Sequence, residues 1–126
     1  MKEVLLDTNF LTMPHTLKID IFTELEKIIL EQHKLIVVSG TIKELTELSK
    51  GNKEVSVAAR VALKLLKERG LDYVESSGNV DDALISYASS HENAIVCTND
   101  KHLKKKLKEV GAEVVCLSGK NKLIRV

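Results

Sequence analysis

Residues 94–100 read Ala-Ile-Val-Cys-Thr-Asn-Asp and join a wholly apolar run to a polar end. An apolar run without alternation is typical of a strand that is covered on both faces. A parallel sheet with helices on both sides covers its central strands in this way. Asp100 then falls just past the predicted strand Ala94–Thr98, where a helix over Lys101–Val110 is expected to begin.

The rest of the chain repeats this alternation of short apolar runs and longer helical periods. The other expected strands are Val4–Leu6, Leu35–Val38, Leu71–Val74, Glu113–Leu117 and an edge strand at Leu123–Val126. The other expected helices are Asp20–His33, Thr41–Ser49, Val55–Arg69 and Val80–His91, with a surface loop at Thr12–Leu17. Because strands separated by helices imply right-handed crossovers, we predict an α/β fold: a three-layer α/β/α arrangement around a central parallel sheet. The length of 126 residues predicts one domain, 1–126.

The composition excludes several classes of protein. Hydrophobic residues make up 44% of the chain but aromatic residues only 3%, so the core is aliphatic and no aromatic platform exists for stacking bases. No apolar run approaches the length of a membrane span, and the N-terminus enters a strand directly, so we expect a cytoplasmic protein with no membrane association. Cys97 and Cys116 lie in apolar runs and are expected to be buried and reduced.

Charge is unevenly distributed along the chain. Residues 1–99 carry 11 Lys and Arg against 15 Asp and Glu, whereas residues 100–126 carry 8 against 3. In the predicted helix Lys101–Val110, Leu103, Leu107 and Val110 recur at the spacing of a face that packs on the sheet. The lysines of this helix should therefore be exposed, and a polyanion such as RNA could bind them: Lys101, Lys104, Lys105, Lys106 and Lys108.

Carboxylates stand at four predicted strand-to-helix junctions: Asp7, Glu44, the pair Asp81 and Asp82, and Asp100. In open parallel sheets, ligands bind beyond the carboxyl ends of the strands, so these residues should gather at one edge. Gathered carboxylates repel one another, and a hard divalent cation such as Mg²⁺ or Mn²⁺ relieves that repulsion. The pattern predicts a metal site there.

Each carboxylate also has a structural explanation. Asp7 suits a turn, Glu44 would complete a capping box with Thr41, and Asp100 could cap the last helix. Asp81 and Asp82 could complement a helix dipole. Four such coincidences at one edge are less plausible than one shared site.

These motifs resemble the PIN-domain ribonuclease family. The resemblance rests on four segments in the same order and context, and it covers essentially the whole chain: Asp7-Thr8-Asn9-Phe10, Ile42-Lys43-Glu44-Leu45, Val80-Asp81-Asp82-Ala83-Leu84 and Ala94–Asp100. The Thr-Asn-Asp-Lys ending and the paired aspartates are most similar to archaeal members and to the rRNA-processing endonucleases. The resemblance to the bacterial toxin ribonucleases of toxin–antitoxin pairs is more distant.

The resemblance implies Mg²⁺- or Mn²⁺-dependent endonucleolytic hydrolysis of single-stranded RNA. It assigns catalytic roles to Asp7, Glu44, Asp100 and either Asp81 or Asp82, with Asp7, Asp81 and Asp100 as metal ligands. Thr8, Asn9 and Thr98 would support the ligands or orient the substrate. Asp81 shares a helical stripe with Leu84 and Ala88, whereas Asp82 stands three residues after a potential cap at Asn79, so Asp81 is the favoured residue.

The implied partners are single-stranded RNA, a second copy in a homodimer, and an antitoxin or a ribosome-assembly partner. Two other hypotheses compete with the nuclease hypothesis. One is a non-catalytic PIN-like RNA-binding or assembly subunit. The other is a phosphoacceptor receiver domain, which would need an acceptor Asp after the third strand, where this chain has Glu75 and Ser76.

Overall fold

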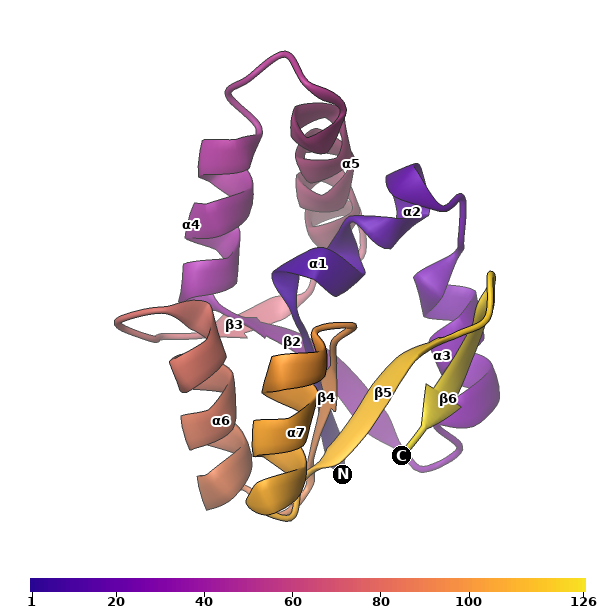
Figure 1. The fold of residues 1–126 in the computed structure, drawn as a ribbon, viewed down its shortest axis with the longest axis vertical. Helices are drawn as coiled ribbons and strands as arrows, with labels where there is room; N and C mark the ends of the chain where they lie inside the picture. The colour runs from indigo at the N-terminus through magenta and orange to yellow at the C-terminus, as the bar shows by residue number, and fades with distance from the viewer.

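The computed structural model describes residues 1–126 and shows a central six-stranded sheet with helices on both faces (Figure 1). The strands are β1 (Lys2–Leu6), β2 (His33–Val38), β3 (Asp72–Val74), β4 (Ala94–Cys97), β5 (Glu113–Ser118) and β6 (Lys122–Arg125). The helices are α1 (Thr8–Leu11), α2 (Met13–Thr16), α3 (Ile21–Ile28), α4 (Ser39–Leu48), α5 (Glu54–Glu68), α6 (Val80–Ser90) and α7 (Lys101–Glu109). The predicted three-layer α/β/α class is confirmed.

The strand order is β3-β2-β1-β4-β5-β6, with β1 to β5 parallel and β6 antiparallel to β5. The chain builds outward from β1 to β3 and then returns to the other side of β1 with β4. The order therefore reverses between β1 and β4, and this switch point is where open sheets bind ligands. Leu6 pairs with Cys97, so the residues that follow these two strands meet at the carboxyl edge.

Alternate residues of the strands enter two separate cores. Val4 and Leu6 of β1 pack with α1, α2, α3 and α5, while Leu5 between them packs with α6 and α7. Figure 1 shows α6 and α7 side by side on one face of the sheet. All four residues of β4 are buried, which confirms that it is a central strand covered on both faces.

The largest differences from the predicted elements concern two segments. The helix expected over Asp20–His33 ends at Ile28, because Ile29 adopts an extended backbone while staying buried. The apolar stripe of α3 continues past the end of the helix, so the spacing of apolar residues alone could not locate that end. The loop expected at Thr12–Leu17 is largely helix α2, with Pro14 in the first turn, where proline is tolerated.

Two predicted burial patterns also need correction. Val110 does not face the sheet but is exposed, because α7 ends at Glu109 and Gly111 turns the chain with a φ of 79°. In the helix expected over Val55–Arg69, the spacing of Val57, Val61 and Leu65 predicts the packing face. The buried residues of α5 instead include Ala59, Ala62 and Leu66, and Val61 is only half-buried. Small alanines let α5 approach its neighbours closely, so size rather than hydrophobicity selects its packing face.

Cys97 and Cys116 are buried and unbridged, as expected. None of the helices combines the length and the apolarity needed to cross a bilayer.

Candidate active site

Asp7 lies at the centre of the carboxyl edge, directly after β1. Its backbone N–H donates to the Cys97 carbonyl at 3.0 Å, which extends the β1–β4 pairing by one step. Its Oδ1 accepts from the Thr8 backbone N–H at 2.8 Å, and its Oδ2 accepts from the Thr98 hydroxyl at 2.6 Å. The side chain is buried, with 4% of the residue exposed, so its position is set by two elements at once.

Burial raises the pKa of the Asp7 carboxyl above its usual range, because desolvation disfavours the charged form. The hydrogen bonds from Thr98 and Thr8 oppose this increase in pKa, and the negative charges of Asp81 and Glu44 add to it. No lysine, arginine or histidine pairs with Asp7.

Asp100 caps helix α7, as its structural explanation proposed. Its Oδ1 accepts from the backbone N–H groups of His102 at 2.8 Å and Leu103 at 3.1 Å. Its own N–H donates to the Thr98 hydroxyl at 3.1 Å, so Thr98 connects Asp7 to Asp100. Capping uses Oδ1 alone, and Oδ2 has no hydrogen-bond partner within the chain. The capping role is therefore compatible with a second role for this carboxylate.

The paired aspartates of α6 face different surroundings. Asn79 caps the helix and exchanges two hydrogen bonds with Asp82: its Oδ1 accepts from the Asp82 N–H and its Nδ2 donates to Asp82 Oδ2. Asp81 has no hydrogen-bond partner, and desolvation followed by the charges of Asp100 and Glu44 raises its pKa. The structure thus brings Asp81 toward the other acids and gives Asp82 a capping role. That Asp81 is the catalytic member of the pair stays a prediction.

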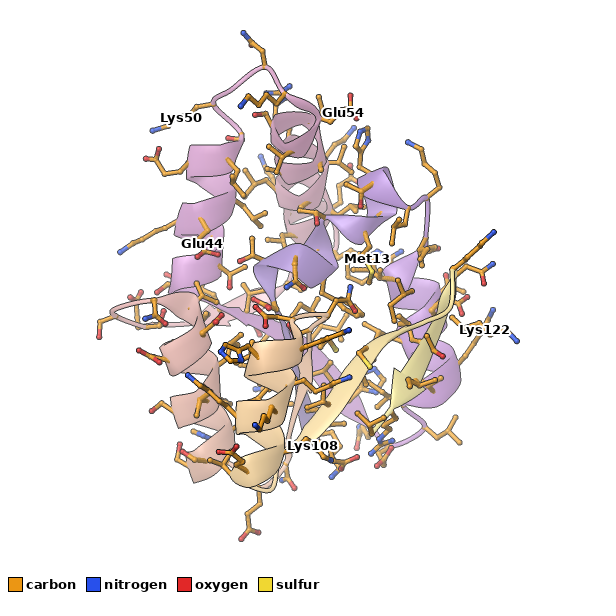
Figure 2. All side chains as sticks on the ribbon, in the orientation of Figure 1. Met13, Glu44, Lys50, Glu54, Lys108 and Lys122 are labelled. Carbon is orange, nitrogen blue, oxygen red and sulfur yellow. The ribbon has the colours of Figure 1, made fainter.

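Glu44 does not form the capping box expected with Thr41, because α4 begins at Ser39 and has no side-chain cap. Instead its Oε1 accepts from the Thr8 hydroxyl of α1 at 2.5 Å. Its charge raises the pKa of both Asp7 and Asp81, so its carboxylate lies toward the same edge of the sheet. Figure 2 labels Glu44 on α4. Thr8 therefore contacts both Asp7 and Glu44, and its role in supporting the metal ligands stays a prediction.

Asn9 and Asn99 hold the loop between β4 and α7 in place. Asn9 Oδ1 accepts from the Asn99 backbone N–H at 3.2 Å, so Asn9 faces this loop. Asn99 Oδ1 accepts from the Leu117 N–H of β5 at 2.9 Å, and its Nδ2 donates to the Met13 sulfur at 3.1 Å. Asn99 was not singled out from the sequence. Its place between Thr98 and Asp100 was the available signal.

The acidic side chains share an edge without forming a closed coordination sphere. No group of three or more Asp, Glu, His or Cys side chains is close enough to hold a metal ion directly. The donor type nevertheless suits Mg²⁺ or Mn²⁺, which bind oxygen ligands and keep several waters in their coordination sphere. A site that uses few direct carboxylate contacts and several waters fits this spacing.

The lysines of α7 divide between two surroundings. Lys101, Lys105 and Lys106 are exposed as predicted, and Lys106 is near enough to the acids to lower the pKa of Asp81. Lys104 is half-buried, with its Nζ 3.9 Å from the sulfur of Cys116. A surface groove of about 550 Å³ runs along the helix and is lined by Lys101, Lys104, Lys105 and Lys108.

The fold and this edge define a class of protein: a three-layer α/β/α domain with a carboxylate cluster at its topological switch point. A model of the PIN-like domain family matches residues 4–120, and the chain belongs to this family.

Named relatives fall in two subgroups. Ribonuclease VapC4 of Methanocaldococcus jannaschii is 33% identical over 124 residues, which are 95% of this chain and 93% of the relative. The rRNA-processing protein fcf1 of Schizosaccharomyces pombe is 26% identical over 98% of this chain and 62% of its own length. The solved structure of the PIN domain endonuclease Utp24 superposes with a TM-score of 0.78 at 22% identity, over 98% of this chain and 92% of that one, and shows the same fold. The predicted resemblance to the PIN family, with archaeal and rRNA-processing members among its relatives, is confirmed.

Proposed function

We propose that this protein is a metal-dependent endoribonuclease that hydrolyses phosphodiester bonds in single-stranded RNA. The names of three relatives support a role on RNA: two archaeal relatives are named ribonucleases, and one yeast relative is named an rRNA-processing protein. We also propose that residues 1–126 act as one PIN-like domain. Its partner would be an antitoxin if it functions like the VapC ribonucleases, or a ribosome-assembly factor if it functions like the rRNA-processing proteins.

The observation that carries the proposal is a set of carboxylates with no basic partner at the switch point of the sheet. None of the five acidic residues at this edge forms an ion pair within the chain, although nine ion pairs occur elsewhere: Asp7, Glu44, Asp81, Asp82 and Asp100. Unpaired acids in one place destabilise a fold unless a cation joins them. A divalent metal is therefore the ligand that suits this edge.

Asp7, Asp81 and Asp100 would hold Mg²⁺ or Mn²⁺ in part through water molecules, because the three carboxylates are not close enough together to bind one ion directly. When bound, such an ion lowers the pKa of a water molecule and offsets the charge that develops on the phosphate. The chain supplies the orientation. Thr98 holds the Asp7 carboxylate through one hydrogen bond and the Asp100 backbone through another, so the two ligands move as a unit.

Glu44 would orient the attacking water. Its Oε1 is held by the Thr8 hydroxyl, and its Oε2 has no hydrogen-bond partner within the chain and can accept from a water. The lysines Lys101, Lys104, Lys105 and Lys106 would contact the phosphates on either side of the cleaved bond. Lysines without aromatic neighbours contact the backbone rather than the bases.

The test is cleavage of a labelled single-stranded RNA with Mn²⁺, Mg²⁺, or EDTA in place of metal. We expect internal cuts with either ion and none with EDTA. A matched hairpin should be cut only in its loop. If RNA binds but is never cut with any divalent ion, the chain is a non-catalytic RNA-binding or assembly subunit instead.

A further inference from the structure

A second groove, of about 420 Å³, opens on the other side of the acidic edge from the α7 lysines. Val38 and Val74, at the ends of β2 and β3, contribute to its lining. Asp82 and Ser86, which lie one turn apart on α6, also line the groove. The groove adjoins the candidate active site, because Asp82 follows Asp81 directly in the first turn of α6.

The loop between β3 and α6 closes the remaining side of this groove. Ser76 of this loop accepts from the Gly40 backbone N–H at 3.0 Å, and its own N–H donates to the Ser39 hydroxyl at 2.9 Å. These bonds attach the loop to the start of α4. The groove is therefore bounded by segments that are hydrogen-bonded to each other and begins at the carboxyl edge of the sheet.

The two grooves that flank the acidic edge have opposite chemistry. The groove along α7 is lined by four lysines together with Glu109 and Val126, whereas the groove beside α6 contains no lysine or arginine. Its polar groups are the serine hydroxyls, the carboxylates of Glu75 and Asp82, and the hydroxyl of Tyr87, which donates to Glu3 at 2.9 Å. Carboxylates repel phosphate oxygens, so the backbone of an RNA does not fit this second groove. An uncharged base does.

The polar atoms of the groove select among the four bases. Glu75 has no hydrogen-bond or ion-pair partner, and Asp82 retains acceptor capacity beyond its bonds with Asn79. A carboxylate accepts hydrogen bonds only. Guanine alone offers two adjacent donors on its Watson–Crick edge, N1–H and the N2 amino group, while adenine and cytosine place an acceptor nitrogen beside their amino group. Val38 and Val74 supply the apolar surface against which a base ring packs.

Given the proposed ribonuclease function, we infer that this groove is a base-binding subsite that selects guanine next to the cleaved phosphate. RNA whose bases are unstacked is read in this way, through hydrogen bonds to the edge of a base held in a pocket. The volume lies within the range of small-molecule sites, roughly 300–1,000 Å³. One side of the active site would then contact the RNA backbone and the other would contact a base.

The first experiment uses nucleosides, which carry no phosphate and need no metal. Guanosine, inosine and adenosine are titrated into the ¹⁵N-labelled full chain, and the backbone amides of Ser76, Ser77 and Ser86 are followed by NMR. We expect guanosine to shift these amides and to bind roughly tenfold more tightly than inosine, which lacks only the N2 amino group. Adenosine should bind no better than inosine.

Glu75→Gln replaces one acceptor oxygen with a donor and should reduce guanosine affinity by roughly tenfold without changing that for adenosine. Glu92→Gln is the matched control, because Glu92 is equally exposed but lies past the far end of α6, and its affinities should equal those of the wild type. Equal binding of the three nucleosides, or no shift of the groove amides, overturns the inference. Shifts caused by N-acetyl-arginine amide but not by guanosine also overturn it and identify the groove as a site for a basic protein segment.

Mapping the cuts in an RNA of mixed sequence gives the second measurement. Cleavage should concentrate beside guanines and fall roughly tenfold where inosine replaces guanine. The two proposals fail separately. Guanosine binding without any cleavage refutes the ribonuclease and leaves the subsite, whereas cleavage with no guanosine binding and no base preference refutes the subsite and leaves the ribonuclease.

Discussion

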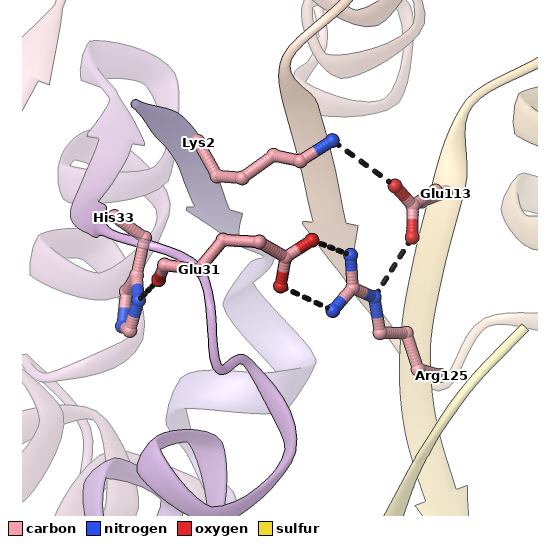
Figure 3. Close-up of polar contacts among 5 residues, drawn as sticks. All are labelled: Lys2, Glu31, His33, Glu113 and Arg125. Carbon is pink, nitrogen blue, oxygen red and sulfur yellow. Dashed lines mark hydrogen bonds and ion pairs between the residues drawn. The ribbon is translucent and has the colours of Figure 1, made fainter.

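The two edges of the sheet carry carboxylates in opposite electrostatic settings. At the carboxyl edge, Asp7 and Asp81 have no basic partner and have raised pKa values. At the amino edge, Arg125 donates to Glu31 at 2.6 and 2.7 Å and to Glu113 at 2.8 Å (Figure 3). These bonds lower the pKa of Glu31 to about 2 and also lower that of Glu113.

The difference teaches which acids are structural. The amino edge satisfies its charges within the chain: Lys2 adds a contact to Glu113 at 3.3 Å, and nothing further is needed there. The carboxyl edge leaves its charges for a ligand. The carboxylates with a lowered pKa thus belong to a stabilising network, and those with a raised pKa belong to a candidate active site.

The largest expected effect is on catalysis at the carboxyl edge. Asp7→Asn or Asp100→Asn should lower Mn²⁺-dependent RNA cleavage on the order of 10³-fold or more, because a ligand of the metal is lost. Glu113→Gln, the matched change at the opposite edge, should cleave at nearly the wild-type rate. Wild-type cleavage by both aspartate variants would remove the distinction between the edges.

A smaller effect separates the paired aspartates of α6. Asp81→Asn should lower the cleavage rate by roughly 10- to 100-fold, since Asp81 lies toward Asp100 and Glu44. Asp82→Asn should weaken the Asn79 cap and lower the melting temperature, and its effect on cleavage should be confined to the preference for guanine. Initial rates and melting curves of the two variants measure this. A greater loss of activity in Asp82→Asn would reverse the assignment.

The exposed lysines of α7 should affect binding more than the chemical step. Replacing Lys101, Lys105 and Lys106 with Gln should weaken RNA binding and flatten its log–log salt dependence by roughly 0.7 per lost phosphate contact. The matched control replaces three exposed lysines outside α7 with Gln: Lys50 and Lys53 between α4 and α5, and Lys64 on α5. An unchanged slope in the α7 variant would move the RNA path to Lys120 and Lys122.

In the absence of metal, the unpaired charge of Asp7 should make the free energy of unfolding depend on pH. Because its pKa is raised in the fold, the native state gains stability as pH falls through that raised value toward the usual one. Asp7→Asn should therefore be more stable than the wild type at neutral pH, by roughly 1 kcal/mol, and the gap should close as the solution is acidified. Saturating Mg²⁺ should raise the melting temperature of the wild type only. A gap that is constant with pH would mean that Asp7 is not charged and unpaired in the fold.

The smallest effect is expected at the amino edge, where the side chains are partly exposed. Arg125→Gln should lower the melting temperature slightly, and high salt should reduce the difference from the wild type. Glu31 has a lowered pKa, so its stabilising contribution is complete above its usual pKa of 4.5 and is lost as pH falls toward about 2. As the pH falls from 4.5 to about 2, the Arg125→Gln variant should lose less stability than the wild type. RNA cleavage should be unaffected.

The order of the six strands and of the five longer helices, and the presence of an acid at four of the junctions, followed from the sequence alone, whereas the short helices α1 and α2 did not. Apolar runs, helical periods and turn residues are local signals, and β4 with its polar end at Thr98 and Asp100 is the clearest of them. The parallel sheet follows from that alternation, because each helix must carry the chain back to the start of the next strand. The resemblance to a known family rests on the same local segments.

Only the tertiary structure decided how the acids face each other. The pairing of Leu6 with Cys97 places Asp7 beside Thr98, and this register depends on contacts between residues some 90 positions apart. The starting point of α4 gave Glu44 a partner in Thr8 instead of a cap. Such contacts depend on which surfaces pack together. A local sequence pattern does not specify which distant residues lie beside it in the sheet.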